Sequence, residues 1–118
     1  MEMHIDEIEY SQDSIGDRFS DGTPLTELCE DILEGTVSVY SLSRICVAER
    51  DGEWFAMDGN RRLFVLKKLY ARGKIDGMVP VKLGYIGKPI TAIPGVDIEV
   101  RGDLDLEDEL DALIDGSM

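Results

Sequence analysis

The chain has 118 residues, of which 43% are hydrophobic, a length and composition that fit one globular domain with a real core. Its formal net charge of −13 argues against sequence-independent DNA binding, which needs a basic face to displace counterions. The single histidine, His4, argues against Ser-His-Asp and Cys-His catalysis and against most zinc sites, so any metal would be held by oxygen ligands.

The sequence predicts neither a transmembrane helix nor a secretory signal. No apolar run approaches the ~20 residues of a transmembrane helix, and the N-terminus lacks the basic and apolar regions of a secretory signal. Cys29 and Cys46 stand alone in apolar surroundings, which is typical of reduced thiols in an intracellular protein. We therefore expect a cytoplasmic protein that does not contact a membrane.

Residues 4–10 fit a short edge strand or one helical turn, and we favour the strand. Residues 11–23 form a polar loop in which Ile15 and Phe19 are apolar anchors. Long loops that tuck in apolar residues are often functional, although a packed surface loop fits the pattern equally well.

A helix is predicted from Thr23-Pro24, with Thr23 as N-cap and Pro24 at the first helical position. The apolar residues that follow at helical spacing are Leu25, Leu28, Cys29, Ile32 and Leu33. Gly35 ends this helix. Residues 37–44 give no clear pattern.

Two strands, residues 45–50 and 53–57, flank Asp51-Gly52, a strong hairpin signal. The hairpin leads into a tight turn and a second helix that ends near Arg72-Gly73. Residues 79–86 then predict another strand, followed by a stretch rich in proline and glycine.

The turn of residues 58–60 is the centre of the chain. Asp58 or Asn60 can cap the following helix, and Gly59 permits a left-handed conformation or the close approach of a ligand. Residues 63–66 are apolar without a break, which predicts that the helix is buried where it begins.

Arg61 and Arg62 open that helix. A helix N-terminus with two arginines suits a phosphate or another oxyanion. The same pattern also fits a capped core helix whose arginines form ordinary salt bridges. Among the charged side chains of residues 61–88 the basic ones dominate, with Asp76 the only carboxylate. A local basic patch can therefore exist on this acidic molecule and bind a nucleotide or nucleic acid.

The end of the chain is acidic. Leu106, Leu110, Leu113 and Ile114 fall at helical spacing, with Asp103 or Asp105 as a possible cap. This segment predicts either a short amphipathic helix that docks on the domain or on a protein partner, or a disordered acidic tail.

The order of elements and the central turn resemble the ParB/sulfiredoxin-like superfamily. Its domain places a strand, a helix and a hairpin before a G-x-R-R or G-C-H-R turn at the start of the next helix. The matching turn here is Gly59-Asn60-Arg61-Arg62, and the likeness covers roughly residues 5 to 83. It is closest to stand-alone ParB-like nuclease domains, which combine such a turn with loops similar to residues 12–15 and 19–22.

Two members of this superfamily differ from the chain. Sulfiredoxins need a cysteine where Asn60 stands, which argues against sulfinic-acid reduction. Chromosome-partitioning ParB proteins have a glutamate there, a downstream E-N-x-x-R box and a helix-turn-helix domain. Here the glutamate is replaced by Asn60, and neither the box nor the helix-turn-helix domain is visible after Leu83. These differences argue against a CTP-gated DNA clamp.

The resemblance implies a nuclease-type domain that binds a nucleotide or nucleic-acid phosphate at residues 58–62 and hydrolyses a phosphoester with Mg²⁺ or Mn²⁺. In this interpretation Asp58, Arg61 and Arg62 are catalytic, and Asp58 and Asp21 hold the metal. The phosphate-binding residues are Gly59, Asn60, Arg61, Arg62, Gln12 and Ser14.

No residue stands out as a general base, so two alternatives remain. One is a non-catalytic nucleotide-binding or protein-interaction module that uses the same turn. The other is a structural remnant in which Arg61 pairs with an acid of the C-terminal segment.

We therefore predict a compact α+β domain of the ParB/sulfiredoxin-like kind over residues 1–88, with a small mixed sheet and two main helices. Residues 89–118 form the acidic C-terminal segment. One core should hold Leu28, Ile32, Val47, Phe55, Leu63, Leu66 and Val81. We expect Arg61 to face a cleft beside the 12–21 loop, and Arg62 to face solvent or a surface acid.

Overall fold

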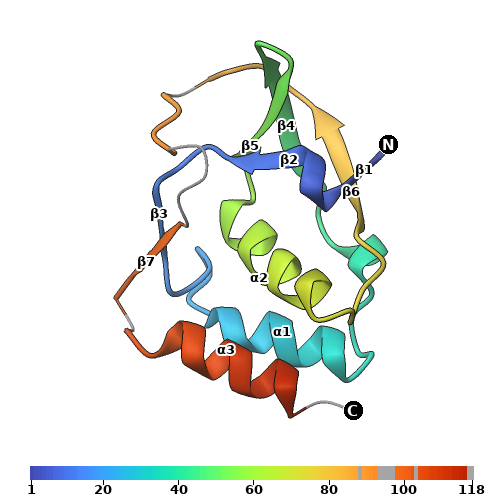
Figure 1. The fold of residues 1–118 in the computed structure, drawn as a ribbon, viewed down its shortest axis with the longest axis vertical. Coiled ribbons are helices and arrows are strands. Elements are labelled where there is room, and N and C mark those ends of the chain that lie inside the picture. Colours follow the sequence, from blue (N-terminus) through green and yellow to red (C-terminus); the bar gives the residue numbers. More distant parts are fainter. Residues whose placement is uncertain (88, 93–97, 103, 117–118) are drawn as a thin grey trace.

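The computed structural model describes residues 1–87, 89–92, 98–102 and 104–116. The strands are β1 (Glu2–His4), β2 (Ile8–Tyr10), β3 (Ser14–Gly16), β4 (Ile45–Arg50), β5 (Glu53–Asp58), β6 (Met78–Leu83) and β7 (Glu99–Arg101). The helices are α1 (Leu25–Leu33), α2 (Asn60–Ala71) and α3 (Leu106–Asp115), with short 3-10 turns η1 (Ile5–Glu7) and η2 (Val39–Ser41) (Figure 1).

A mixed sheet of five strands has the order β1-β6-β4-β5-β2. The β4–β5 and β1–β6 pairs are antiparallel, whereas β2 runs parallel to β5 and β6 parallel to β4. Outside this sheet, β3 and β7 form a parallel pair. The predicted α+β class is confirmed, and the described residues form three α-helices where the sequence predicted two main ones and a possible third.

The predicted hairpin is confirmed. Asp51 and Gly52 have φ angles of 54° and 83°, as a tight two-residue turn requires. The predicted strand over residues 79–86 is too long, because β6 ends at Leu83 and the chain then leaves the sheet. Residues 4–10 are not one strand either, since η1 separates β1 from β2.

Helix α1 begins one residue later than predicted, with Pro24 at the N-cap position. The expected cap by Thr23 is wrong because that residue has another partner. Its backbone N–H and its hydroxyl donate to Asp21 Oδ1 over 3.0 and 2.7 Å. Gly35, with a φ of 78°, follows the C-cap residue Glu34 and ends the helix as expected.

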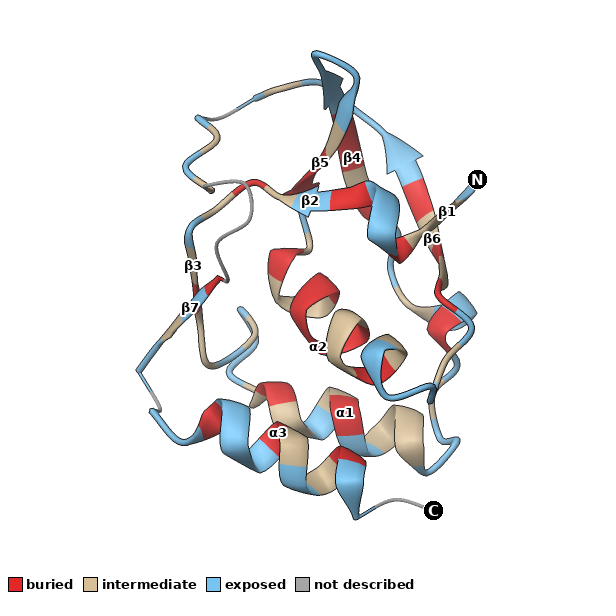
Figure 2. Cartoon of the chain, viewed as in Figure 1, coloured by how far each residue is buried: buried red, intermediate tan, exposed pale blue. Residues whose placement is uncertain are grey.

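The core lies between one face of the sheet and the helices. Helix α2 lies between the sheet and the α1–α3 pair (Figure 1), and residues 63–66 are all buried in it, as predicted (Figure 2). Of the other residues predicted to be buried, Leu28 and Ile32 are only partly buried. Phe55 is buried in a second, smaller cluster with Ala48 and Met57, because alternate residues of a strand face opposite sides of the sheet.

Helix α3, in the acidic C-terminal segment, is docked on the domain. Leu106, Leu110 and Ile114 on α3 are buried in the main cluster, while Leu113 is partly buried. Asp105 occupies the N-cap position without a side-chain bond, and Asp103 lies outside the described residues. The docked-helix interpretation is therefore confirmed over a disordered tail. Within the described residues, the helices are too short and too polar to cross a membrane.

Candidate functional site

The turn between β5 and α2 is built on Gly59. Its φ of 90° is left-handed, as expected, and it occupies the N-cap position of α2. The predicted cap by Asp58 or Asn60 is wrong, since no side chain caps this helix. The backbone N–H groups of a first helical turn have no acceptor within the helix, so those of α2 are available to an acceptor from outside.

A second reason for glycine at this position is the close approach of Arg62. A Cβ atom on Gly59 would lie 2.9 Å from Arg62 Nη2 and 3.3 Å from Ile45 Cγ1. Glycine therefore supplies both the backbone conformation and the space in which the guanidinium lies against the turn.

Asn60 is buried and holds the turn in place. Its Nδ2 donates to Ser11 Oγ over 3.0 Å and to the Ala56 carbonyl over 3.3 Å. Its Oδ1 accepts from the Ser11 backbone N–H over 3.0 Å. Both amide donors are used, so the side chain has a structural role, while the phosphate contact expected of Asn60 stays a prediction. Asn60 and Ser11 are also the only buried polar residues in the described part of the chain.

Arg61 and Arg62 donate to backbone carbonyls. Arg61 Nη1 contacts the Arg18 oxygen at 2.5 Å, and Arg62 Nη1 contacts the Ser43 oxygen. Within the described residues, neither arginine forms an ion pair. The alternative of a core helix whose two arginines form ordinary salt bridges therefore finds no such bridges in this part of the chain.

The acids of α3 contact other bases. Asp111 Oδ1 lies 3.1 Å from Lys68 Nζ and 3.3 Å from Arg72 Nη2. The structure therefore gives no support to a pairing of Arg61 with an acid of the described C-terminal residues.

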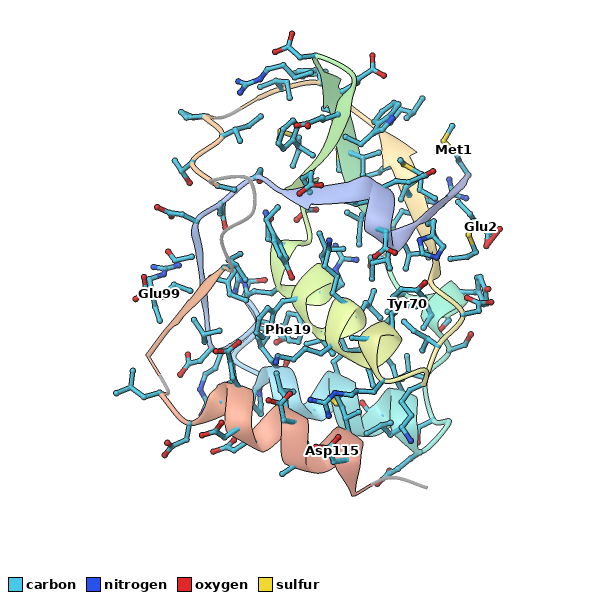
Figure 3. All side chains as sticks on the ribbon, in the orientation of Figure 1. Met1, Glu2, Phe19, Tyr70, Glu99 and Asp115 are labelled. Atoms are coloured by element: carbon cyan, nitrogen blue, oxygen red, sulfur yellow. The ribbon has the colours of Figure 1, made fainter. Side chains whose placement is uncertain are left out.

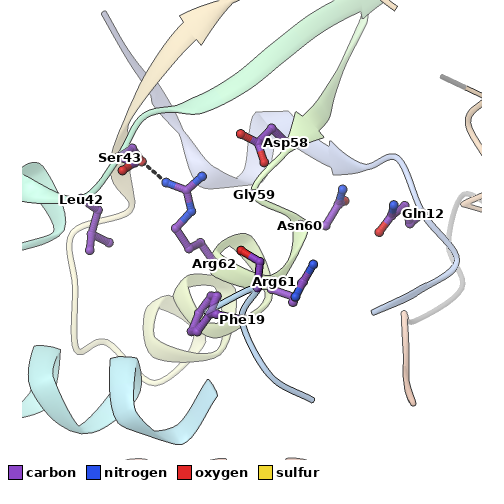
Figure 4. A pocket seen from close by; sticks show the side chains of 10 residues that line it. Gln12, Phe19, Leu42, Ser43, Asp58, Gly59, Asn60, Arg61 and Arg62 are labelled. Carbon is purple, nitrogen blue, oxygen red and sulfur yellow. Dashed lines mark hydrogen bonds between the residues drawn. The ribbon is translucent and has the colours of Figure 1, made fainter. Parts of the chain in front are cut away.

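Both arginines line one pocket of about 450 Å³. The other lining residues are Gln12, Phe19, Ser20, Leu42, Ser43, Asp58, Gly59 and Asn60 (Figure 4). In Figure 4 the two side chains extend to different sides of the turn. The expected division, with Arg62 turned to solvent or a surface acid, is wrong because Arg62 lies over Gly59 inside the pocket.

The structure brings together only part of the predicted site. Gln12, Asp58 and residues 59–62 line the pocket, whereas Ser14 and Asp21 are not among its lining residues. The carboxylate of Asp21 accepts two bonds from Thr23, and these bonds hold the pKa of Asp21 below its ordinary value.

A metal site made by the protein alone does not fit the residues present. Across the described residues, no group of three or more histidine, cysteine, aspartate or glutamate side chains is placed to hold a metal ion. Asp58 is exposed and is the only carboxylate among the lining residues of the pocket. Asp58 and Asp21 are therefore not grouped with a third such side chain in the described part of the chain, and the binding of Mg²⁺ or Mn²⁺ stays a prediction.

Sequence reasoning did not identify Ser11, Leu42 and Ser43. Ser43 takes part through its backbone oxygen, which any residue type offers, so the sequence carries no signal for it. Ser11 had a weak signal, namely a small polar residue directly after a strand and before the polar loop.

No family model, curated protein or solved structure matches this chain.

Proposed function

We propose that the pocket binds a phosphate group of a nucleotide. The observation that carries the proposal is the position of two guanidinium groups, neither paired with a described carboxylate, beside an uncapped helix N-terminus in one pocket. The ends of helices and arginine forks are the groups with which proteins most often hold phosphate.

The bonds of the two arginines favour binding. Each guanidinium is fixed by a carbonyl, which is neutral, so its position is set while its full charge remains for a ligand. Arginine has five N–H donors, so a single internal bond leaves most of them available. A charge-assisted bond to a phosphate in such a site is worth roughly 1.5–3 kcal/mol.

The size and charge of the molecule favour a small ligand. A pocket of about 450 Å³ lies within the usual range for small-molecule sites. A long nucleic acid would meet repulsion from a chain whose net charge is −13, whereas a single nucleotide contacts the pocket alone. We therefore favour a free nucleotide over a nucleic-acid strand as the ligand.

Hydrolysis of a phosphoester is a second candidate, which the resemblance to ParB-like nuclease domains also suggests. It depends on Asp58, the one carboxylate among the lining residues. A carboxylate beside a bound phosphate can orient or deprotonate a water molecule. Mg²⁺ or Mn²⁺ would have to be held largely by phosphate oxygens, a common arrangement for Mg²⁺.

Calorimetric titration with a panel of nucleotides and short oligonucleotides tests the proposal, with and without Mg²⁺ or Mn²⁺. Arg61→Ala and Arg62→Ala should each weaken nucleotide binding about tenfold or more, the equivalent of about 1.4 kcal/mol. Arg50→Ala removes the same charge from the exposed end of the hairpin and is the matched control. Arg61→Lys should not restore binding, because an ammonium lacks the guanidinium fork.

The panel separates the candidates. Binding without turnover supports the nucleotide-binding module. Turnover that Asp58→Asn abolishes while binding is kept supports hydrolysis. If the two pocket variants change binding no more than Arg50→Ala does, the pocket is not an anion site.

A further inference from the structure

The outer side of the α1–α3 pair carries a groove that is separate from the arginine pocket. It has a volume of about 400 Å³ and is lined by Thr26, Glu30, Glu109, Ala112 and Leu113. Its floor is mainly apolar, and a glutamate from each helix stands at its rim. It shares no lining residue with the arginine pocket.

Helices α1 and α3 are negatively charged and have no basic residues that would neutralise their carboxylates. Helix α1 contains three carboxylates and helix α3 contains five, and neither contains a basic residue. Oxygen-tipped side chains extend along α3 to Asp115 in Figure 3. Glu30 and Glu109 at the rim are exposed and form no ion pair with any described base.

The inner side of the same pair is already packed against a helix with basic residues. Lys68 lies on helix α2, and Arg72, four residues further on, is the C-cap residue of that helix. Glu107, Asp111 and Asp115 on α3 are spaced in the same way and pair with them, with Lys68 Nζ 3.8 Å from Glu107 and 3.1 Å from Asp111. The outer side repeats this chemistry, with an apolar strip flanked by acids, but has no such helix on it among the described residues.

We propose that the outer groove of α1 and α3 binds a basic amphipathic helix of a partner protein. Alanine and leucine on α3 would pack against the apolar face of that helix, and Glu30 and Glu109 would pair with flanking lysines or arginines. A second copy of this chain does not fit, because like charges would face each other across the interface.

The probe is a synthetic helical peptide of about four turns with leucine and alanine on one face and lysine on both flanks. A peptide of identical composition but shuffled order, whose apolar residues are spread around the helix, is the control. Binding to the full chain is measured by fluorescence anisotropy, and the contact site by backbone NMR shifts. We expect shifts at the groove residues and binding at least about tenfold weaker for the shuffled peptide.

Two variants test the groove itself. Glu109→Lys should weaken binding about tenfold, whereas Glu53→Lys, the same charge change on the exposed hairpin, should have little effect. Ala112→Trp fills the groove without changing its charge and should also weaken binding, which keeps the test valid if Glu109→Lys impairs folding.

Several results would overturn the proposal. Equal binding of the ordered and shuffled peptides, or equal effects of the two lysine variants, would show general attraction to an acidic protein. The absence of binding for the ordered leucine and alanine peptide would rule out a helix site. A dimer in solution that Ala112→Trp dissociates would identify a second copy as the occupant.

Discussion

Asn60 and Ser11, 49 residues apart in the sequence, satisfy each other's hydrogen bonds inside the protein. The Asn60 amide accepts from the Ser11 N–H and donates to its hydroxyl, each over 3.0 Å. This pair joins the start of α2 to the chain that follows β2. It therefore sets the position of Gln12 beside the turn and gives the pocket one of its walls.

Ser11→Ala tests the energetic role of that pair. The change removes the acceptor of a buried amide donor, which should lower the free energy of unfolding by about 1–3 kcal/mol. Urea denaturation measures the loss. Ser41→Ala removes a bond between an exposed hydroxyl and the Ser38 carbonyl, and should change stability by less than about 0.5 kcal/mol. Equal losses in the two variants would contradict the assigned role.

Gly59→Ala and Gly73→Ala separate two effects at the turn. Both glycines have left-handed φ angles, 90° and 72°, so each substitution should cost about 1–2 kcal/mol of stability. Only a Cβ on Gly59 meets other atoms, with Arg62 Nη2 at 2.9 Å, whereas the space at Gly73 is open. We therefore expect similar losses in urea denaturation but weaker nucleotide binding only in Gly59→Ala. Unchanged binding there would show that the position of Arg62 over the turn does not matter.

Local signals in the sequence predicted the helices and strands well, but they did not predict which distant segments pair. Asp51-Gly52 determines its hairpin by turn geometry alone, and the apolar run of residues 63–66 predicts burial without any knowledge of partners. The parallel pairing of β3 with β7 and the Ser11–Asn60 bonds join segments that no local pattern connects. Thr23 does not cap α1, because its N–H and hydroxyl donate to Asp21 and Pro24 takes the N-cap position.

The site shows the same limit. The turn and its arginines follow from residue types next to each other in the chain. What each arginine contacts depends on the backbone oxygens of Arg18 and Ser43, which come from distant loops and carry no side-chain signature. The sequence could therefore indicate the centre of the pocket and Gln12 beside it, but not the wall that Leu42 and Ser43 form.

The bond from the Tyr40 hydroxyl to Asp76 Oδ2, 2.7 Å long, should give stability a dependence on pH at both extremes. The hydrogen bond from Tyr40 lowers the pKa of Asp76 below its ordinary 3.8, so its contribution is present above pH 3.8 and is lost as the pH falls further. The same bond raises the pKa of Tyr40 above 10.0, so its contribution is present below pH 10.0 and is lost as the pH rises through the raised pKa.

Melting temperatures of the wild type and Tyr40→Phe across the pH range test this dependence. The wild type should be the more stable protein at neutral pH, and the two curves should converge in strong acid and strong alkali. Tyr85→Phe removes a hydroxyl from a side chain that is 85% exposed and is the matched control. A constant difference between wild type and Tyr40→Phe at every pH would contradict the titration of this pair.

Leu110→Ala tests whether α3 is part of the folding unit. Leu110 is fully buried against the other helices, and removal of a buried leucine side chain usually costs about 2–5 kcal/mol. Leu104→Ala changes a side chain that is 91% exposed and should be nearly neutral, within about 0.5 kcal/mol. Because α3 pairs with Lys68 and Arg72 and not with the pocket arginines, nucleotide binding by the folded Leu110→Ala protein should be unchanged. A neutral Leu110→Ala would mean that α3 adds nothing to stability, and stronger nucleotide binding in that variant would mean that its acids compete for the pocket.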